Sequence, residues 1–149
     1  MAAPTIILQH EAWKTHWKNA RADIRKSVKA VLQHEGIKPC AIAIVLMDDA
    51  AIRPLNKTYR HKDKPTNVLS FPSGEEDSLG DILLAFETIE REAAEQHKDF
   101  TRHAVHLVVH GTLHLLGYDH EKPKEAEEME AKEIAILATL GIANPYLVP

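Results

Sequence analysis

Three histidines stand close together in the segment HGTLHLLGYDH, which runs from His110 to His120. His110 and His114 are four residues apart, so on a helix both rings lie on one face and can present nitrogens to the same point. Gly117 can adopt a left-handed backbone without a Cβ penalty and reverse the chain, which brings His120 back towards that point. The spacing H-x3-H-x2-G-x2-H therefore predicts a site for one zinc ion per chain, with the three histidines as ligands.

Three protein ligands indicate a catalytic site, because structural zinc is held by four ligands whereas catalytic zinc keeps a position for water or substrate. A bound zinc ion lowers the pKa of its water from about 15.7 to about 7, so hydrolysis is the expected chemistry. Cys40, the one cysteine, has no partner motif and is not expected to be a fourth ligand. His106 lies one turn upstream of His110 and is expected to pack or to support the site, whereas His103 is expected to be exposed.

The residue after the first histidine distinguishes two kinds of hydrolysis. The same spacing marks the metzincin proteases when that residue is Glu, the general base, but here it is Gly111. Glycine can neither activate water nor protonate a poor amine leaving group, as peptide hydrolysis requires. A phosphodiester instead needs the charge on the transferring group neutralised by Arg, Lys or a metal. The segment LNKTYRHKDKPTNVLSFP (55–72) contains candidate cations.

Together, HGTLHLLGYDH, this upstream segment and LGDI (79–82) resemble the YbeY-type endoribonucleases, small zinc-dependent proteins of bacterial ribosomal RNA maturation. The resemblance covers residues from about Asp48 to Leu140. It implies that the three histidines bind zinc, that Arg60 is a functional cation at the active groove, and that the zinc helix packs on a small mixed sheet. One departure is Asn67, where the family often has Asp. The change matters if that position activates water, and matters little if it only makes hydrogen bonds.

The other candidate site residues are polar groups near the motif. Arg60 can fork onto two phosphate oxygens, although a helix C-terminus also favours an arginine. Ser70 is expected to hydrogen-bond in the groove. Asp81 and Asp119 are candidates for orienting a zinc histidine through its second nitrogen, and each is equally open to being a cap or turn residue.

The chain is thus predicted to be a metal-dependent endoribonuclease acting on single-stranded RNA. The resemblance implies a role in ribosomal RNA processing, notably of the 3′ end of the small-subunit RNA, and in ribosome quality control, with the small ribosomal subunit and its assembly proteins as partners. One alternative is a metzincin-like peptidase, for which Asp119 and Glu121 are the only nearby acids. The other is a non-enzymatic ribosome-assembly factor with a structural metal, in which His114→Ala unfolds the protein and Arg60→Glu leaves ribosome maturation intact.

Composition favours one globular domain over residues 1–149, since 44% of the residues are hydrophobic, 27% are charged and no Gly/Ser-rich linker appears. The first residues lack a secretory signal, and no apolar run approaches the ~20 residues of a membrane span, so a cytoplasmic protein without a membrane partner is expected. The net charge of −4 combines +6 over residues 1–64 (12 Lys/Arg, 6 Asp/Glu) with −10 over residues 65–149 (6 and 16). A cationic groove on an acidic protein is therefore compatible with the sequence, as are ordinary solvated helix faces.

Hydrophobic periodicity predicts the elements that position these residues. Four strands are expected at 5–9, 41–47, 65–72 and 79–86, and about five helices at 11–33, 48–60, 87–96, 101–116 and 123–140. Trp13 and Trp17 are expected to be packed in the core rather than to stack on bases. Pro54 implies that the second helix starts late or has an irregular first turn. The class is α+β, with one small mixed four-stranded sheet and the zinc-binding helix on it.

Overall fold

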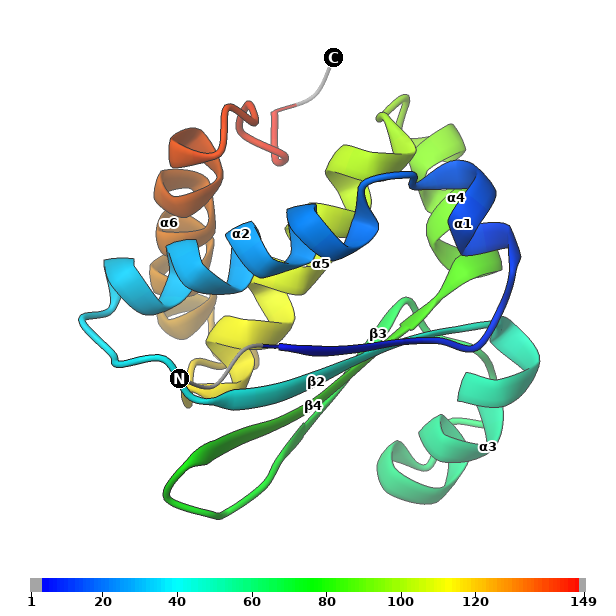
Figure 1. The fold of residues 1–149 in the computed structure, drawn as a ribbon, viewed down its shortest axis with the longest axis horizontal. Coiled ribbons are helices and arrows are strands. Elements are labelled where there is room, and N and C mark those ends of the chain that lie inside the picture. Colours follow the sequence, from blue (N-terminus) through cyan, green and yellow to red (C-terminus); the bar gives the residue numbers. More distant parts are fainter. Residues whose placement is uncertain (1–3, 148–149) are drawn as a thin grey trace.

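The computed structural model describes residues 4–147. These described residues form four strands and six helices around one sheet (Figure 1). In chain order they are β1 (Thr5–Leu8), α1 (Ala12–His16), α2 (Ala20–His34), β2 (Ala41–Met47), α3 (Asp49–Arg60), β3 (Val68–Pro72), β4 (Ser78–Ala85), α4 (Phe86–Glu95), α5 (Phe100–Leu115) and α6 (Pro123–Thr139). The predicted α+β class with one four-stranded sheet is confirmed.

The sheet is mixed, with strand order β1-β2-β4-β3. β1, β2 and β4 are parallel, while β3 pairs antiparallel with β4. The apolar run of β2 lies at the centre of the sheet and buries Ile42, Ile44 and Leu46 on one face. Because side chains alternate along a strand, the same face of β4 presents Ile82 and Leu84 to the core. The helix that carries the histidines, α5, packs on this face of the sheet.

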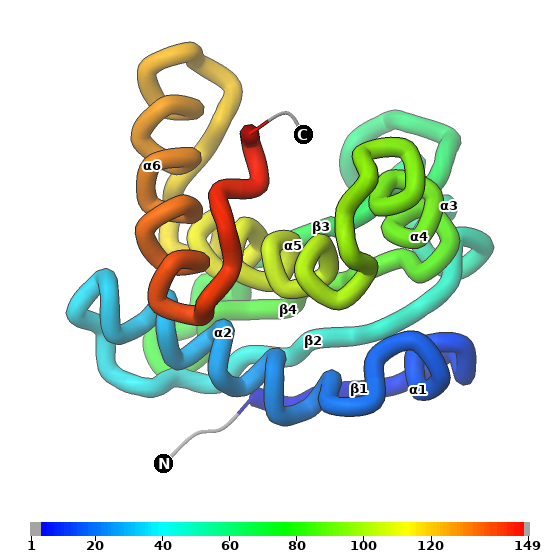
Figure 2. The backbone as a smooth tube through the Cα atoms, turned by 90° about the horizontal axis from the view of Figure 1, so that it is seen from above, coloured from blue at the N-terminus to red at the C-terminus, as the bar shows by residue number. Residues whose placement is uncertain are grey.

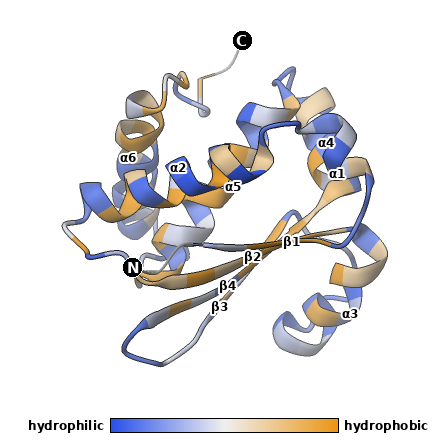
Figure 3. Ribbon diagram, in the orientation of Figure 1, coloured by the Kyte–Doolittle hydropathy of each residue, from blue (hydrophilic) through white to orange (hydrophobic). Residues whose placement is uncertain are grey.

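The other helices lie on the side of that face, where α5 contacts β3 and β4, while α3 lies against the opposite face (Figures 1 and 2). α5 runs across the sheet at the centre of the helical layer, with α2, α4 and α6 packed around it. Most residues of α5 itself are buried, and many of them are apolar, as expected for a helix inside a core (Figure 3). The expected packing of the histidine-bearing helix on the sheet is confirmed.

The N-terminal helical stretch differs from the prediction. The single helix expected over 11–33 is two helices, because the chain leaves helical geometry at Trp17, whose φ is −139°. Trp13 and Trp17 are buried as expected, and each indole N–H has a partner: Trp13 donates to the carbonyl of Met47, and Trp17 to Asp23. The hydrophobic periodicity did not reveal the break, because the apolar residues before and after Trp17 continue the same helical spacing.

The start of α3 and the start of β3 can each be compared with the prediction. α3 begins directly after Asp48, whose carboxylate accepts the N–H of Ala51, and Pro54 lies inside the helix. The helix therefore starts at the aspartates rather than later. The strand expected over 65–72 forms only from Val68 to Pro72. Within residues 4–147, no helix is both long and apolar enough to cross a membrane.

Candidate metal centre and its groove

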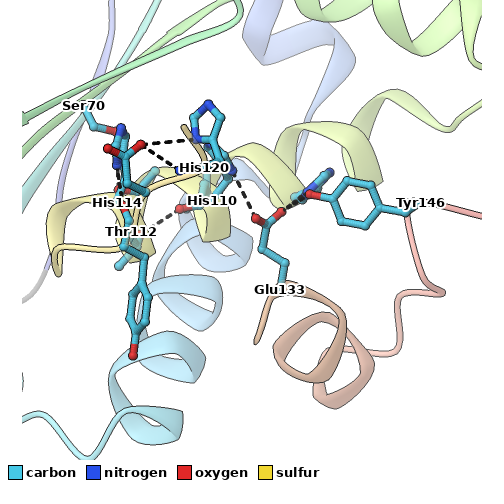
Figure 4. A network of polar contacts seen from close by, with 12 residues as sticks. Ser70, His110, Thr112, His114, His120, Glu133 and Tyr146 are labelled. Carbon is cyan, nitrogen blue, oxygen red and sulfur yellow. Dashed lines mark hydrogen bonds and ion pairs between the residues drawn. The ribbon is translucent and has the colours of Figure 1, made fainter. Parts of the chain in front are cut away.

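The three histidines of the motif converge at the end of α5 (Figure 4). His110 and His114 lie one turn apart on this helix, which ends at Leu115. Gly117 then adopts φ +105° and the chain turns back to His120. The ring centroids lie 5.2 Å apart for His110 and His120, 5.7 Å for His114 and His120, and 6.1 Å for His110 and His114. The three rings therefore lie close together, while the ligand atoms that lie within 4.8 Å of one another are those of His114, His120 and Asp119, without His110.

Two of these rings have their tautomer set by a neighbour that can only accept a hydrogen bond. Nδ1 of His114 donates to the carbonyl oxygen of Tyr118 at 2.7 Å, and Nδ1 of His110 donates to the carboxylate of Glu133 at 3.2 Å. A hydrogen therefore sits on Nδ1, and in the neutral ring Nε2 carries the lone pair that can bind a metal. Burial, together with His110 and His114, lowers the pKa of His120 and favours its neutral ring as well. The ligand atoms thus suit a divalent cation such as zinc.

Glu133 on α6 is the partner that sequence reasoning missed. Its side chain is 1% exposed and accepts hydrogen bonds from His106, His110 and the hydroxyl of Tyr146, the last at 2.6 Å (Figure 4). Burial raises the pKa of Glu133, but these hydrogen bonds outweigh it and hold the pKa at about 2, so the carboxylate is ionised. One signal was available. Glu133 takes the place of an apolar residue in the buried stripe that Met129, Ile136 and Leu137 form on α6.

His106 and His103 are both buried on α5, and only the first was expected to be inside. His106 donates to Glu133, the same carboxylate that accepts from His110, which agrees with a supporting role. The exposed position expected for His103 is wrong. Its Nε2 lies 2.9 Å from the carboxylate of Glu92, because α4 covers that side of α5.

The two aspartates suggested as orienting residues lie in different places. Asp119 joins His114 and His120, and one ligand atom from each lies within 4.8 Å of the others. Its Oδ1 accepts the backbone N–H of His120 at 2.7 Å, so the carboxylate belongs to the turn itself. Asp81 is exposed and directly precedes Ile82 in β4. Since Ile82 faces α5 and side chains alternate along a strand, the side chain of Asp81 points to the opposite face of the sheet. The orienting role considered for Asp81 is therefore replaced by Glu133 and the Tyr118 carbonyl.

Gly111 lies where the metzincins carry their catalytic glutamate, and the structure gives a physical reason for the glycine. A Cβ at this position would lie 3.1 Å from two carbons of Ile82 and 3.1 Å from the hydroxyl of Ser70. The position therefore faces the sheet, and a side chain there would crowd Ile82 and Ser70, which would have to shift. Ser70 also donates to the carbonyl of Gly111 at 3.3 Å, which ties β3 to the histidine helix.

Arg60 and the histidines line the same groove, which we call the histidine groove. Its volume is about 460 Å³. The lining residues are Tyr59, Arg60, Asn67, Val68, Leu69, Ser70, Phe71, His110, His114, Asp119, His120 and Glu121. Arg60 is exposed at the end of α3, and its charge helps to lower the pKa of His120. A cation that can fork onto phosphate thus stands beside the candidate metal ligands.

A second cavity of about 700 Å³ adjoins the first, since His110, His120, Asn67 and Val68 line both. Asn67 donates from its amide nitrogen to both oxygens of Glu92, at 3.0 and 3.2 Å. Burial raises the pKa of Glu92, but hydrogen bonds from His103 and Asn67 lower it on balance. Asn67 is therefore a hydrogen-bond donor to a carboxylate in this chain, a role that an ionised aspartate could not fill.

Comparison with known proteins gives a consistent result. The family model described as "Endoribonuclease YbeY" matches residues 6–141. Proteins of that name are 52% identical over 74% of this chain and 86% of the relative (Magnetococcus marinus) and 46% identical over 95% and 90% (a Bradyrhizobium strain). A solution structure of a Thermotoga maritima protein covers 93% of this chain and 91% of its own, with a TM-score of 0.59 and 27% identity.

Proposed function

The chain belongs to the YbeY endoribonuclease family, and from this premise we propose that it is a zinc-dependent enzyme that cuts single-stranded RNA. The observation that carries the proposal is the shared groove. Three histidines, two of which have their Nδ1 engaged and Nε2 available, and one exposed arginine line it together. A metal site and a phosphate-binding cation are the two features that phosphodiester cleavage needs side by side.

We assign His110, His114 and His120 as the zinc ligands. The fit rests on the tautomers, because Glu133 and the Tyr118 carbonyl hold the Nδ1 hydrogens and leave Nε2 free. When bound, zinc supplies an acidified water and polarises a phosphoryl oxygen. One ion per chain is proposed, because the ligand atoms of His114, His120 and Asp119 form the one such group among residues 4–147, and the ring of His110 lies next to it.

The remaining groups in the groove act on the phosphate and the attacking water. Arg60 binds the scissile phosphate through its guanidinium fork and stabilises the charge that develops on its oxygens. Asp119 has a carboxylate oxygen within 4.8 Å of ligand atoms of His114 and His120, which supports the proposal that it is the base that takes a proton from water. Ser70 keeps β3 against α5, so that the wall of the groove holds its position relative to the histidines.

The substrate and the cellular setting are inferred from the family. We propose that the chain processes ribosomal RNA, including the 3′ end of the small-subunit RNA, and acts in ribosome quality control in the cytoplasm. Its partners would then be the small ribosomal subunit and assembly proteins. The resemblance of the motifs and the name "Endoribonuclease YbeY" of the relatives support this assignment. The basic first 64 residues, which include Arg60, offer the charge that an RNA partner requires.

The deciding experiment compares Arg60→Glu and Arg60→Lys with the wild type in metal content and cleavage of single-stranded RNA. We expect both variants to bind about one metal ion and to unfold like the wild type, because Arg60 is exposed. Arg60→Glu should lose cleavage by about 100-fold or more, and Arg60→Lys should fall between, since lysine keeps the charge but not the fork.

Each alternative function makes a different forecast for the same proteins. If the chain were an assembly factor with a structural metal, no preparation would cleave RNA, and His114→Ala would unfold. If it were a peptidase, the wild type would cleave a peptide library and leave RNA intact. Gly111 speaks against the second alternative, since this position faces Ile82 and Ser70 instead of the metal site.

A further inference from the structure

Tyr59 is the most exposed Phe, Trp or Tyr in the described part of the chain, with 62% of its surface accessible. It lies in the last turn of α3, next to Arg60, and lines the histidine groove. An exposed aromatic ring is costly in water, and here it stands within one residue of the cation assigned to phosphate. The role proposed for Arg60 leaves Tyr59 unexplained.

Among residues 4–147 the ring has one aromatic partner, and most of the surface of Tyr59 stays accessible. Tyr59 meets Phe71 of β3 with ring centroids 4.9 Å apart and an interplanar angle of 64°. In such an edge-to-face pair the edge of one ring meets one face of the other, so Phe71 leaves at least one face of the Tyr59 ring uncovered. The pair therefore forms a small aromatic shelf, which we call the Tyr59 shelf, at the side of the groove away from the helix that carries His110 and His114.

The backbone around Tyr59 is held in place by local hydrogen bonds. His61 ends α3 in the left-handed region, with φ +59°, and its N–H bonds to the carbonyls of Lys57 and Asn56. The side chain of Asn56 is 1% exposed and donates to the carbonyl of Lys64 at 2.9 Å, which pins the loop after the helix. The Tyr59 shelf is thus preorganised and loses little freedom when a ligand binds.

We propose that the Tyr59 shelf is a stacking subsite for one nucleobase of single-stranded RNA, beside the phosphate bound by Arg60. This inference rests on the proposed nuclease function and names where that substrate's base is recognised. Aromatic rings bind single strands by stacking on any base, because every base has a π-face. Phosphate and base belong to the same or neighbouring nucleotides, so an arginine and an aromatic ring one residue apart suit such a ligand.

The simplest competing reading is that Tyr59 only shields Phe71 from water. Two substitutions separate the readings. Tyr59→Leu keeps an apolar side chain against Phe71 but removes the flat ring. Tyr59→Phe is the matched control, because it keeps the ring and removes only the hydroxyl.

The experiment measures binding of a fluorescent single-stranded RNA by anisotropy, in a His114→Ala background so that the RNA stays intact, and cleavage kinetics in the otherwise wild-type protein. Loss of one base–aromatic stack is expected to weaken binding by about 5- to 150-fold. We expect Tyr59→Leu to weaken RNA binding and raise KM within that range, with kcat changed much less. Tyr59→Phe should stay within about twofold of wild type.

RNAs with one base removed at each position in turn test whether a base is the ligand. One such position should weaken binding to the parent protein and make no difference to binding by Tyr59→Leu. Equal binding by the leucine variant and the parent, or a loss that no base position accounts for, overturns the stacking subsite. Thermal unfolding of both variants checks that the shelf still folds.

The same series separates this inference from the proposed function. If the wild type neither cleaves nor binds single-stranded RNA, the nuclease proposal itself has failed. If the wild type cleaves RNA and Arg60→Glu does not, while Tyr59→Leu behaves like wild type, only the stacking subsite is refuted.

Discussion

The substitution Glu133→Gln tests whether α6 controls the metal site through a hydrogen bond. Oε1 of Glu133 accepts hydrogen bonds from Tyr146 and His106, and Oε2 accepts one from His110. Glutamine has only one oxygen, so one of these sites becomes an NH₂ donor. If the oxygen stays with Tyr146, the amide donates to Nδ1 of His110, and the ring hydrogen must move to Nε2. That nitrogen then has no lone pair for a metal.

The size of the effect follows from the pKa of Glu133 and from its role beside a ligand. The pKa falls from 4.5 to about 2, and a difference of 4.5 − 2 corresponds to roughly 3 kcal/mol of folding free energy at neutral pH. Since glutamine keeps part of the hydrogen bonding, we expect a loss of about 2 kcal/mol in the free energy of unfolding. Metal affinity should fall by about 10- to 100-fold, the usual cost of losing a group that orients a ligand.

The assay is urea unfolding of the metal-free protein together with competition for zinc against a chromophoric chelator, both at pH 7. Glu128→Gln is the matched control, because Glu128 lies exposed on the same helix. Zinc affinity of Glu133→Gln equal to that of Glu128→Gln would refute the orienting role of Glu133. A loss of stability with unchanged zinc affinity would show that the carboxylate serves the core alone.

Three further predictions follow from the same contacts. Because the pKa of Glu133 is depressed in the folded state, its stabilisation is complete above about pH 4.5 and is lost as pH falls towards 2, so the gap in unfolding free energy between wild type and Glu133→Gln should close over that range. Gly111→Ala should lower the unfolding free energy by about 1 kcal/mol despite alanine's better helix propensity, since Cβ would crowd Ile82 and Ser70; a higher Tm would contradict this. Asn67→Asp should lower the free energy of unfolding by about 2 kcal/mol at pH 7, because a second carboxylate would then face Glu92. Unfolding curves should show this loss becoming smaller towards pH 4, where one of the two carboxyl groups is protonated.

Most elements were predictable because their signals are local. The apolar run of β2, the aspartate cap before α3 and the glycine after α5 each lie within a few residues of the structure that they determine. The break at Trp17 was not predictable from periodicity, since it depends on where the two indoles find Met47 and Asp23 in the folded chain. His103 was assigned to the surface for the same reason: its burial depends on α4.

The candidate site was likewise predictable where its geometry is local and not where it depends on distant segments. The sequence alone determined that His110, His114 and His120 converge, because a helical turn and a glycine reversal are short-range geometry. Only the tertiary structure decided the groups around them. It brought Glu133 from α6 under His110 and set Arg60 and Tyr59 across the groove. Such contacts join segments far apart in the chain, and they form only when burial of the common core packs the helices onto one sheet.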